Sequence, residues 1–189
     1  MARTPKKLAH TYLTTSLASV YTVPASTRTQ VTEIWLTNTD PKTTRNVTIT
    51  AGTLAAKNAI GCKVAVAPAD TVIISDAKVV LVSTASETLG GYVDGTNTGT
   101  ATGGTSSTIT LSTASTTSAV DDYYNGGIIE LTNNSPAGTL GLSKIVTDYV
   151  GSTKVATVDS VWATYPVSAA TTYIMGPLYI TLFGIEEGV

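Results

Sequence analysis

Residues 145–162 read IVTDYVGSTKVATVDSVW, in which two short runs of alternating β-forming residues flank the break Val150-Gly151-Ser152-Thr153. Alternation with a period of two is typical of a half-buried strand, and a short Gly-containing break between two such runs is typical of a β-hairpin. The stretch holds no pair of side chains that could act together as nucleophile and base. It therefore predicts a hairpin that carries no catalytic chemistry.

The same alternation continues on both sides of this hairpin. Thr supplies about one residue in five of the 189, and its β-branched carbon suits a pleated strand better than a helix. Turn signals such as Pro68-Ala69-Asp70 and Ser75-Asp76-Ala77 separate the runs at a spacing that is typical of an antiparallel sandwich or jelly roll. The predicted strands are SVYTV (19–23), VTEIWLTN (31–38), VTITA (47–51), KVAVA (63–67), TVIIS (71–75), KVVLVS (78–83), TITL (108–111), GIIELT (127–132), SKIVTDY (143–149), KVATVDSVW (154–162) and TTYIM (171–175).

Two Gly-rich stretches divide this series of strands. Residues 90–108 read GGYVDGTNTGTATGGTSST, a composition typical of a flexible linker, and Gly176-Pro177 interrupts the chain again before its last strand. The segment between the two breaks therefore reads as an insertion. We expect an all-β protein in which an antiparallel β-sandwich or jelly-roll-like domain carries an inserted small β domain. The predicted parts are an N-terminal arm (1–18), a discontinuous sandwich domain (19–95 plus 177–189) and the inserted module (96–176).

The closing strand, LYITLFGIEEGV (178–189), has two chemically different faces. Tyr179, Thr181 and Phe183 share one face, and Ile180 and Leu182 share the other. Such a strand needs a sheet to join.

Composition excludes several classes of protein. Charged residues make up 13% of the chain and the formal net charge is −2, which gives no basic face for nucleic acid. Cys62 is the only cysteine, so no internal disulfide can form and no Cys/His zinc cluster is present. The sequence contains no run of 18 apolar residues, so no membrane span is predicted, and the N-terminus is too polar for a secretory signal. With so little charge, the surface is either solvated through hydroxyl groups or covered by other subunits.

Candidate catalytic groups are sparse. His10 is the only histidine, and we interpret it as a solvated or interface residue. Asp121-Asp122 and Glu186-Glu187 lack the spacing of a calcium loop and read as solvated turns. We therefore expect no catalytic residues, no metal site, no cofactor and no enzymatic activity.

The large aromatic residues admit two interpretations. Trp35 stands in the middle of VTEIWLTN and Trp162 ends the hairpin. Exposed rings would form stacking platforms for a carbohydrate or a receptor, whereas buried rings would each fill about 150–250 Å² of core surface. We expect the second arrangement, with Trp35, Trp162 and Phe183 as structural core.

Two stretches resemble virion proteins of tailed bacteriophages. The first is VYTVPASTRTQVTEIWLTNTD (20–40), followed by RNVTI, KVVLVS and the closing YITLFGIE; it resembles a small β domain recurrent in such proteins. The second spans residues 99–175, with TGTATGGTSSTITLS, YNGGIIELT and TTYIM; it is similar to a module inserted into many phage structural proteins. That module occurs in head-associated and tail-associated proteins alike.

The resemblance implies a capsid decoration (cement) protein. Such a protein is made in the host cytoplasm, sits on the outer surface of the phage head and ties neighbouring major capsid subunits together. A homotrimer would match the local threefold positions of the shell. Arg3, Lys6 and Lys7 would form an arm against an acidic capsid groove, the alternative for these residues being a frayed, solvated tail. The alternative function is a tail-associated or baseplate adhesion protein whose inserted module contacts a host-surface glycan.

Overall fold

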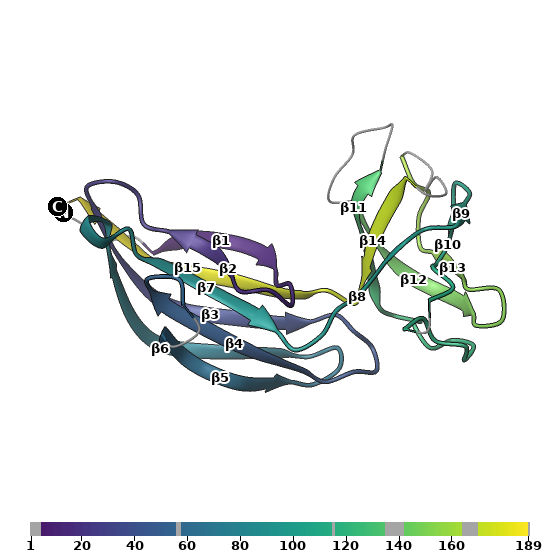
Figure 1. Cartoon of the computed structure of the whole chain (residues 1–189), viewed down its shortest axis with the longest axis horizontal. Helices are drawn as coiled ribbons and strands as arrows, with labels where there is room; N and C mark the ends of the chain where they lie inside the picture. The colour runs from purple at the N-terminus through teal and green to yellow at the C-terminus, as the bar shows by residue number, and fades with distance from the viewer. Residues whose placement is uncertain (1–4, 56–57, 115, 135–141, 164–169, 189) are drawn as a thin grey trace. The chain divides into compact units, whose positions relative to one another are not determined.

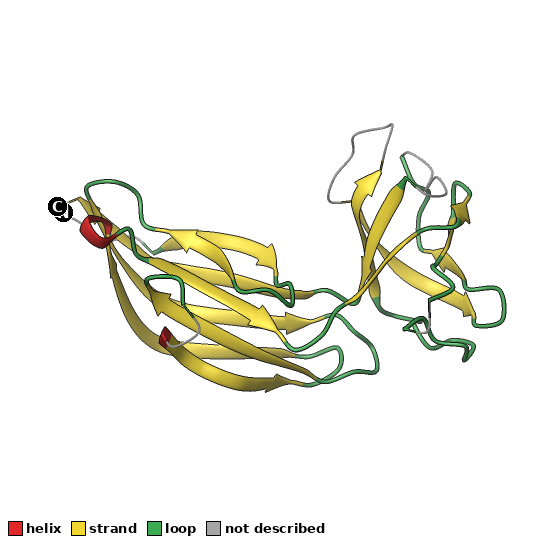
Figure 2. Ribbon diagram, in the orientation of Figure 1, coloured by secondary structure: helices red, strands yellow, loops and turns green. Residues whose placement is uncertain are grey.

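The computed structural model describes residues 5–55, 58–114, 116–134, 142–163 and 170–188 (Figure 1). The fold is all-β and its sheets are antiparallel, as predicted (Figure 2). The chain divides into two compact units. Unit 1 consists of Met1–Asn38, Thr44–Gly95 and Leu178–Val189, and unit 2 of Thr39–Thr43 and Thr96–Pro177. None of the described residues forms a helix long and apolar enough to cross a membrane.

Unit 1 is a β-sandwich of two four-stranded sheets. One sheet has the order β1-β15-β3-β6 and the other the order β2-β7-β4-β5, and one cluster of buried residues contains side chains from both. The 3₁₀ turn η2 (Ser83–Ala85) follows β6. The strands are β1 (Lys6–Tyr12), β2 (Ala18–Thr22), β3 (Thr27–Asn38), β4 (Arg45–Gly52), β5 (Ala59–Val66), β6 (Thr71–Val82), β7 (Thr88–Val93) and β15 (Leu178–Gly188).

The core of unit 1 is built by alternation along the strands. Ile180 and Leu182 of β15 are fully buried, and their cross-strand neighbours Leu36 and Ile34 of β3 are buried too. The residues between them point to the other face, because successive side chains of a strand alternate. The two faces predicted for the closing strand are therefore confirmed.

The N-terminal segment is not an arm up to residue 18. Residues Lys6–Tyr12 form the edge strand β1, which pairs antiparallel with β15, and Leu8 and Ala9 pack against the core of unit 1. Its short sequence, KKLAHTY, alternates only weakly, and its place in the sheet depends on a partner strand more than 160 residues away. The prediction that the first strand begins at Ser19 is wrong for this reason.

Two other segments differ from their predictions. Residues 71–75 and 78–83 were expected as two strands with a turn between them, whereas β6 runs through both as one strand. Asp76 and Lys78 adopt positive φ angles there, so the residues with turn chemistry form a bulge within the strand. The Gly-rich stretch 90–108 is also not a plain linker, because it contains the end of β7 and all of β8 and β9.

Unit 2 contains one seven-stranded sheet of order β8-β14-β11-β12-β13-β10-β9. β12 and β13 pair antiparallel, which confirms the hairpin predicted from residues 145–162. A bulge between Val146 and Asp148 turns both Val146 and Tyr149 into the core, although three positions separate them. The strands are β8 (Asn97–Thr100), β9 (Gly103–Gly104), β10 (Thr108–Thr110), β11 (Ile128–Asn134), β12 (Leu142–Val150), β13 (Val155–Val158) and β14 (Thr171–Met175).

The C-terminal end of unit 2 depends on a close backbone approach. Gly176 has a φ of +61°, and a Cβ there would lie 2.7 Å from the Cα of Asp40. Asp40 is itself buried, and its carboxylate accepts hydrogen bonds from the backbone N–H groups of Lys42 and Thr43. Only glycine fits this conformation at this distance.

Candidate functional site

The outer face of the β1-β15-β3-β6 sheet gathers aromatic residues from three strands. Pairing places His10, Thr181, Trp35 and Ile73 in one row across the sheet. Paired residues of antiparallel strands point to the same face. We define the aromatic face as His10, Tyr12, Trp35, Ile73, Tyr179 and Phe183, with the threonines that lie among them.

This face is exposed although it is largely apolar. Trp35 is 37% exposed and Ile73 is 52% exposed, while Tyr12, Tyr179 and Phe183 are half-buried. Exposed apolar groups that are contiguous across a sheet mark an interaction surface more often than isolated ones do.

The rings of the aromatic face pack on one another. His10 and Tyr179 stack with their ring centroids 5.2 Å apart and their planes inclined by 11°. Trp35 and Phe183 lie 5.3 Å apart with a tilt of 54°. The rings therefore turn part of their faces toward each other instead of forming an open, coplanar platform for a sugar ring.

Polar atoms of this face also pair within it. The Trp35 Nε1–H donates to Glu33 Oε2 at 2.9 Å. His10 Nδ1 and Thr181 Oγ1 are 2.8 Å apart, and the hydroxyls of Thr37 and Thr71 are 3.1 Å apart. Because these groups bond laterally, the face offers mainly apolar contact to a partner.

The expectation that Trp35 and Phe183 belong to the core is corrected by the structure. Trp35 alternates with the inward-facing Ile34 and Leu36, so it must point outward. Phe183 is half-buried and lies outside both clusters of buried residues. Trp162 is 2% exposed and belongs to the core of unit 2.

The predicted basic arm is dispersed. Arg3 lies outside the described residues. Lys7 is an exposed residue of β1 whose register partner is Phe183, so it stands at the margin of the aromatic face. Lys6 forms an ion pair with Glu186, with Nζ and Oε2 2.5 Å apart.

Glu186 is the centre of a polar link between the two sheets of unit 1. The Tyr21 hydroxyl of β2 donates to Glu186 Oε1 and lies 2.9 Å from the buried Thr29 hydroxyl. The hydrogen bonds from Lys6 and Tyr21 lower the pKa of Glu186. Burial, reinforced by the bond to Glu186, raises the pKa of Tyr21 to about 12. This link fastens β1 and β2 to the closing strand.

Three buried tyrosines of unit 2 hold the loop that precedes β11. The Tyr149 hydroxyl donates to the Ser118 carbonyl at 2.6 Å, and the Tyr124 hydroxyl accepts from the Ser118 N–H at 2.9 Å. The Tyr173 hydroxyl accepts from the Ser112 N–H. Burial raises the pKa of Tyr149 to about 12 and also raises the pKa of Tyr173. These hydroxyls satisfy loop backbone groups, so their role is structural.

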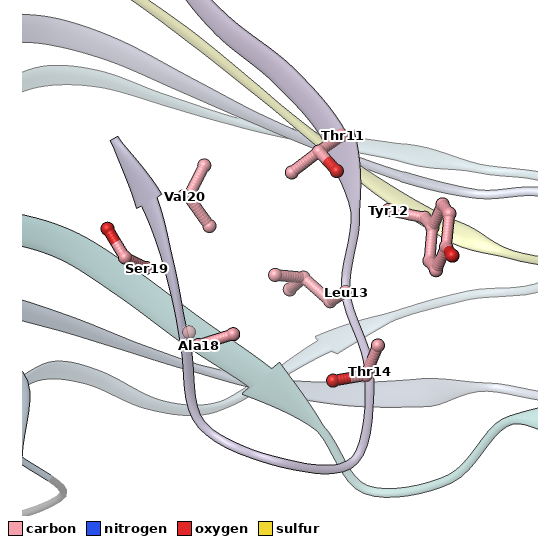
Figure 3. A pocket seen from close by; sticks show the side chains of 8 residues that line it. Thr11, Tyr12, Leu13, Thr14, Ala18, Ser19 and Val20 are labelled. Carbon is pink, nitrogen blue, oxygen red and sulfur yellow. The ribbon is translucent and has the colours of Figure 1, made fainter. Parts of the chain in front are cut away.

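A small pocket opens between β1 and β2 on the other side of the sandwich from β5 and β6. Its volume is about 220 Å³, and the side chains of Thr11, Leu13 and Val20 face the space between the strands while Tyr12 points away (Figure 3). Tyr12 is the only ionisable residue among the eight that line it. The pocket therefore brings no acid and base together.

Of the two acidic pairs, Asp121-Asp122 lies in a loop, whereas Glu186-Glu187 lies in strand β15 and not in the solvated turn that was expected. Asp121 accepts a hydrogen bond from the Gly151 N–H at 2.8 Å, and Asp122 accepts one from the Asn125 side chain at 2.7 Å. Within the described ranges, no three His, Cys, Asp or Glu side chains lie close enough together to hold a metal ion.

Comparisons with protein-family models, curated proteins and solved structures give no match to this chain. The site therefore stands on its own geometry. Sequence reasoning placed Tyr179, Thr181 and Phe183 on one face, but it missed Ile73 and Tyr12. The sequence did hold one signal for this face: along β3 and along β15, every second residue points outward. Once the register of the two strands is known, these outward residues lie side by side.

Proposed function

We propose that this chain is a non-enzymatic virion structural protein, a capsid decoration protein that binds the outer surface of a phage head. The observation that carries the proposal is the aromatic face, an exposed and largely apolar sheet surface whose polar atoms are paired laterally. The sequence resemblance to phage virion proteins supplies the class of partner, the major capsid protein.

The chemistry of the aromatic face favours protein contact over ligand recognition. A sugar site needs free donors and acceptors beside its rings, whereas Trp35 Nε1 and His10 Nδ1 are already engaged. A protein partner needs only a complementary apolar surface. Fully burying one large apolar side chain contributes about 1.5–3 kcal/mol, so contacts with Trp35 and Ile73 are modest for each subunit.

Repetition makes modest contacts sufficient. When several linked copies engage one lattice, the second and later contacts are intramolecular and the attachment becomes firm. We propose a closed homo-oligomer, because a closed ring satisfies heterologous contacts without leaving sticky ends. The resemblance to phage virion proteins favours a trimer, which would match the local threefold positions of the shell. Lys7, at the margin of the aromatic face, would add an electrostatic contact to an acidic capsid surface. No nucleic acid, membrane or cofactor takes part.

The alternative, a tail-associated adhesion protein, would use unit 2 to contact a host glycan. The described aromatic side chains of unit 2 are buried or half-buried, so none of these rings is an open platform for stacking. Copy number separates the two functions. A decoration protein is present in proportion to the major capsid subunit, whereas a tail component is present in a small fixed number, and quantitative mass spectrometry of purified virions measures this ratio.

The same substitution in each unit tests the attachment surface. Ile73→Glu adds a charge to the aromatic face, and Val161→Glu adds one at a 66% exposed apolar position of unit 2. In cosedimentation with undecorated heads we expect Ile73→Glu to bind at least about tenfold more weakly, a difference of about 1.4 kcal/mol, and Val161→Glu to bind like the wild type. Failure of the wild-type protein to bind heads would favour the tail.

A further inference from the structure

A second apolar feature lies at the opposite edge of the sandwich from the β1–β2 pocket. β5 and β6 are the edge strands of their sheets there, and a pocket of about 200 Å³ opens beside them. We call it the edge pocket. Every residue that lines it is apolar, including four isoleucines from four different strands: Ile34, Ile49, Ile60 and Ile74.

Bulges in both edge strands accompany this opening. On β6, Val79 pairs with Val31 and Ser75 with Glu33, so three residues oppose one. On β5, Val64 pairs with Val47 and Gly61 with Ile49, so two residues oppose one. Bulges interrupt the row of backbone groups that an incoming strand would need. The edge pocket is therefore unsuited to strand addition and suited to a single inserted side chain.

The size of the edge pocket agrees with that occupant. A cavity of about 150 Å³ lined by Leu, Ile and Phe side chains stays dry and binds benzene. The edge pocket is somewhat larger, and Ile60, which lines it, is 51% exposed. A leucine or phenylalanine side chain would cover Ile60 and contact the isoleucines behind it.

The charges on the bulges indicate what flanks that side chain. Lys63 and Lys78 have positive φ angles of 51° and 50° and are exposed. The side chain of neither lysine has a hydrogen bond or ion pair with another residue that the structure describes. Asp76 is the one acidic residue on the bulges, so the two bulges together carry a net charge of +1. Acidic residues beside the inserted side chain would complement it.

We propose that the edge pocket binds a large apolar side chain presented by an acidic segment of a partner protein. This site is distinct from the aromatic face, and the proposal does not depend on attachment to a phage head. It assigns a role to the paired bulges, which interrupt both sheet edges and carry two exposed lysines in the same strands that line the pocket.

Isoleucine δ1-methyl NMR spectra of the full chain test this proposal directly. The probe is the blocked peptide Asp-Glu-Leu-Glu-Asp, with one control peptide in which Ala replaces Leu and another in which Lys replaces every acidic residue. We expect the first peptide to shift the methyl signals of Ile34, Ile49, Ile60 and Ile74, and to leave those of Ile109 and Ile129 in unit 2 unchanged. Both control peptides should bind several-fold more weakly.

Two substitutions that reduce the pocket volume complete the test. A Cβ on Gly61 would lie 3.5 Å from Val64 Cγ2 and 3.8 Å from Ile49 Cδ1, which is ordinary contact, so Gly61→Ala should fold and weaken peptide binding. Ala77→Leu should abolish it. The proposal is overturned if the wild-type methyl signals do not respond, if the lysine peptide binds as well as the acidic one, or if both folded variants bind like the wild type. If a variant fails to fold, the binding of the three peptides to the wild-type protein still tests the proposal.

Discussion

In unit 1 the aromatic side chains other than Tyr21 lie outside the buried core, whereas in unit 2 most of the described aromatic side chains fill it. Trp35 and Phe183 of unit 1 contact each other on the outer face of a sheet, and the core behind them consists almost entirely of Val, Leu and Ile. In unit 2, Trp162 and three tyrosines are buried in one cluster. Two regions of one chain therefore use the same residue types for opposite purposes.

The difference shows that parity along a strand, and not residue type, decides where a ring lies. Ile34 and Leu36 occupy inward positions of β3, so Trp35 between them points away from the core. In unit 2 the inward position of Tyr149 is set by a bulge in β12. A ring that the core does not need is available for contact with another molecule.

The largest expected effect is that of Trp162→Ala. Removing a buried tryptophan should lower the free energy of unfolding of unit 2 by about 3–5 kcal/mol. Because the buried residues of the two units form separate clusters, the unfolding of unit 1 should be unchanged. Calorimetry of the wild type and the variant measures both transitions. Equal destabilisation of both units would show that the two units do not have independent cores.

Tyr149→Phe should have a smaller effect, which also depends on pH. The variant loses the bond to the Ser118 carbonyl and should be less stable by about 1–2 kcal/mol at neutral pH. Burial raises the pKa of Tyr149 from 10.0 to about 12, so the stability from its protonated form is present below pH 10 and is lost as the pH rises toward 12. Denaturant titrations should show the wild type losing this advantage between those values. A difference that stays constant up to pH 12 would contradict the burial of this hydroxyl.

Glu186→Gln should have a still smaller effect in unit 1. The pKa of Glu186 is lowered by Lys6 and Tyr21, so its contribution is present above its ordinary pKa of 4.5 and is lost as the pH falls through the lower folded value. Because the pair with Lys6 is near the surface, we expect less than about 1 kcal/mol at pH 7. Thermal unfolding curves of both proteins should converge in acid. If the variant is as stable as the wild type at every pH, the hydrogen bonds of Glu186 do not stabilise unit 1.

Trp35→Ala is expected to change stability far less than Trp162→Ala does. It loses the contact with Phe183 at a partly exposed position, so the cost should be about 1 kcal/mol or less. The contrast with Trp162→Ala is the quantitative form of the comparison. Chemical denaturation checks it, and a loss for Trp35→Ala close to that of Trp162→Ala would mean that unit 1 needs its tryptophan for folding.

The all-β class and most strands followed from alternation, as in the hairpin of residues 145–162 and in the closing strand. β1 could not be found in this way, because KKLAHTY becomes a strand only through its pairing with β15. The turn residues Ser75-Asp76-Ala77 led to the wrong prediction of two separate strands for a related reason. They bend the chain, but the residues on both sides pair with the same strand β3, so the result is a bulge.

The candidate site was predictable only in part. The outward set Tyr179, Thr181 and Phe183 follows from one strand, but joining it to Trp35 and Ile73 requires the register of three strands. Register depends on contacts far apart in the sequence, which a single sequence does not display. The edge pocket depends on bulges in two strands and was not visible for the same reason.

The most direct test of the central claim uses the two tryptophans as reporters of the two units. Trp162→Phe leaves Trp35 on the aromatic face, and Trp35→Phe leaves Trp162 in the core of unit 2. Each variant is labelled with 5-hydroxytryptophan, which can be excited apart from the tryptophans of the head proteins. Emission and acrylamide quenching are then measured with and without undecorated heads. The account predicts that on binding, the Trp35 reporter shifts to shorter wavelength and becomes protected from quenching, while the Trp162 reporter does not change. A Trp35 reporter that remains equally quenched in protein that cosediments with heads would contradict attachment through the aromatic face.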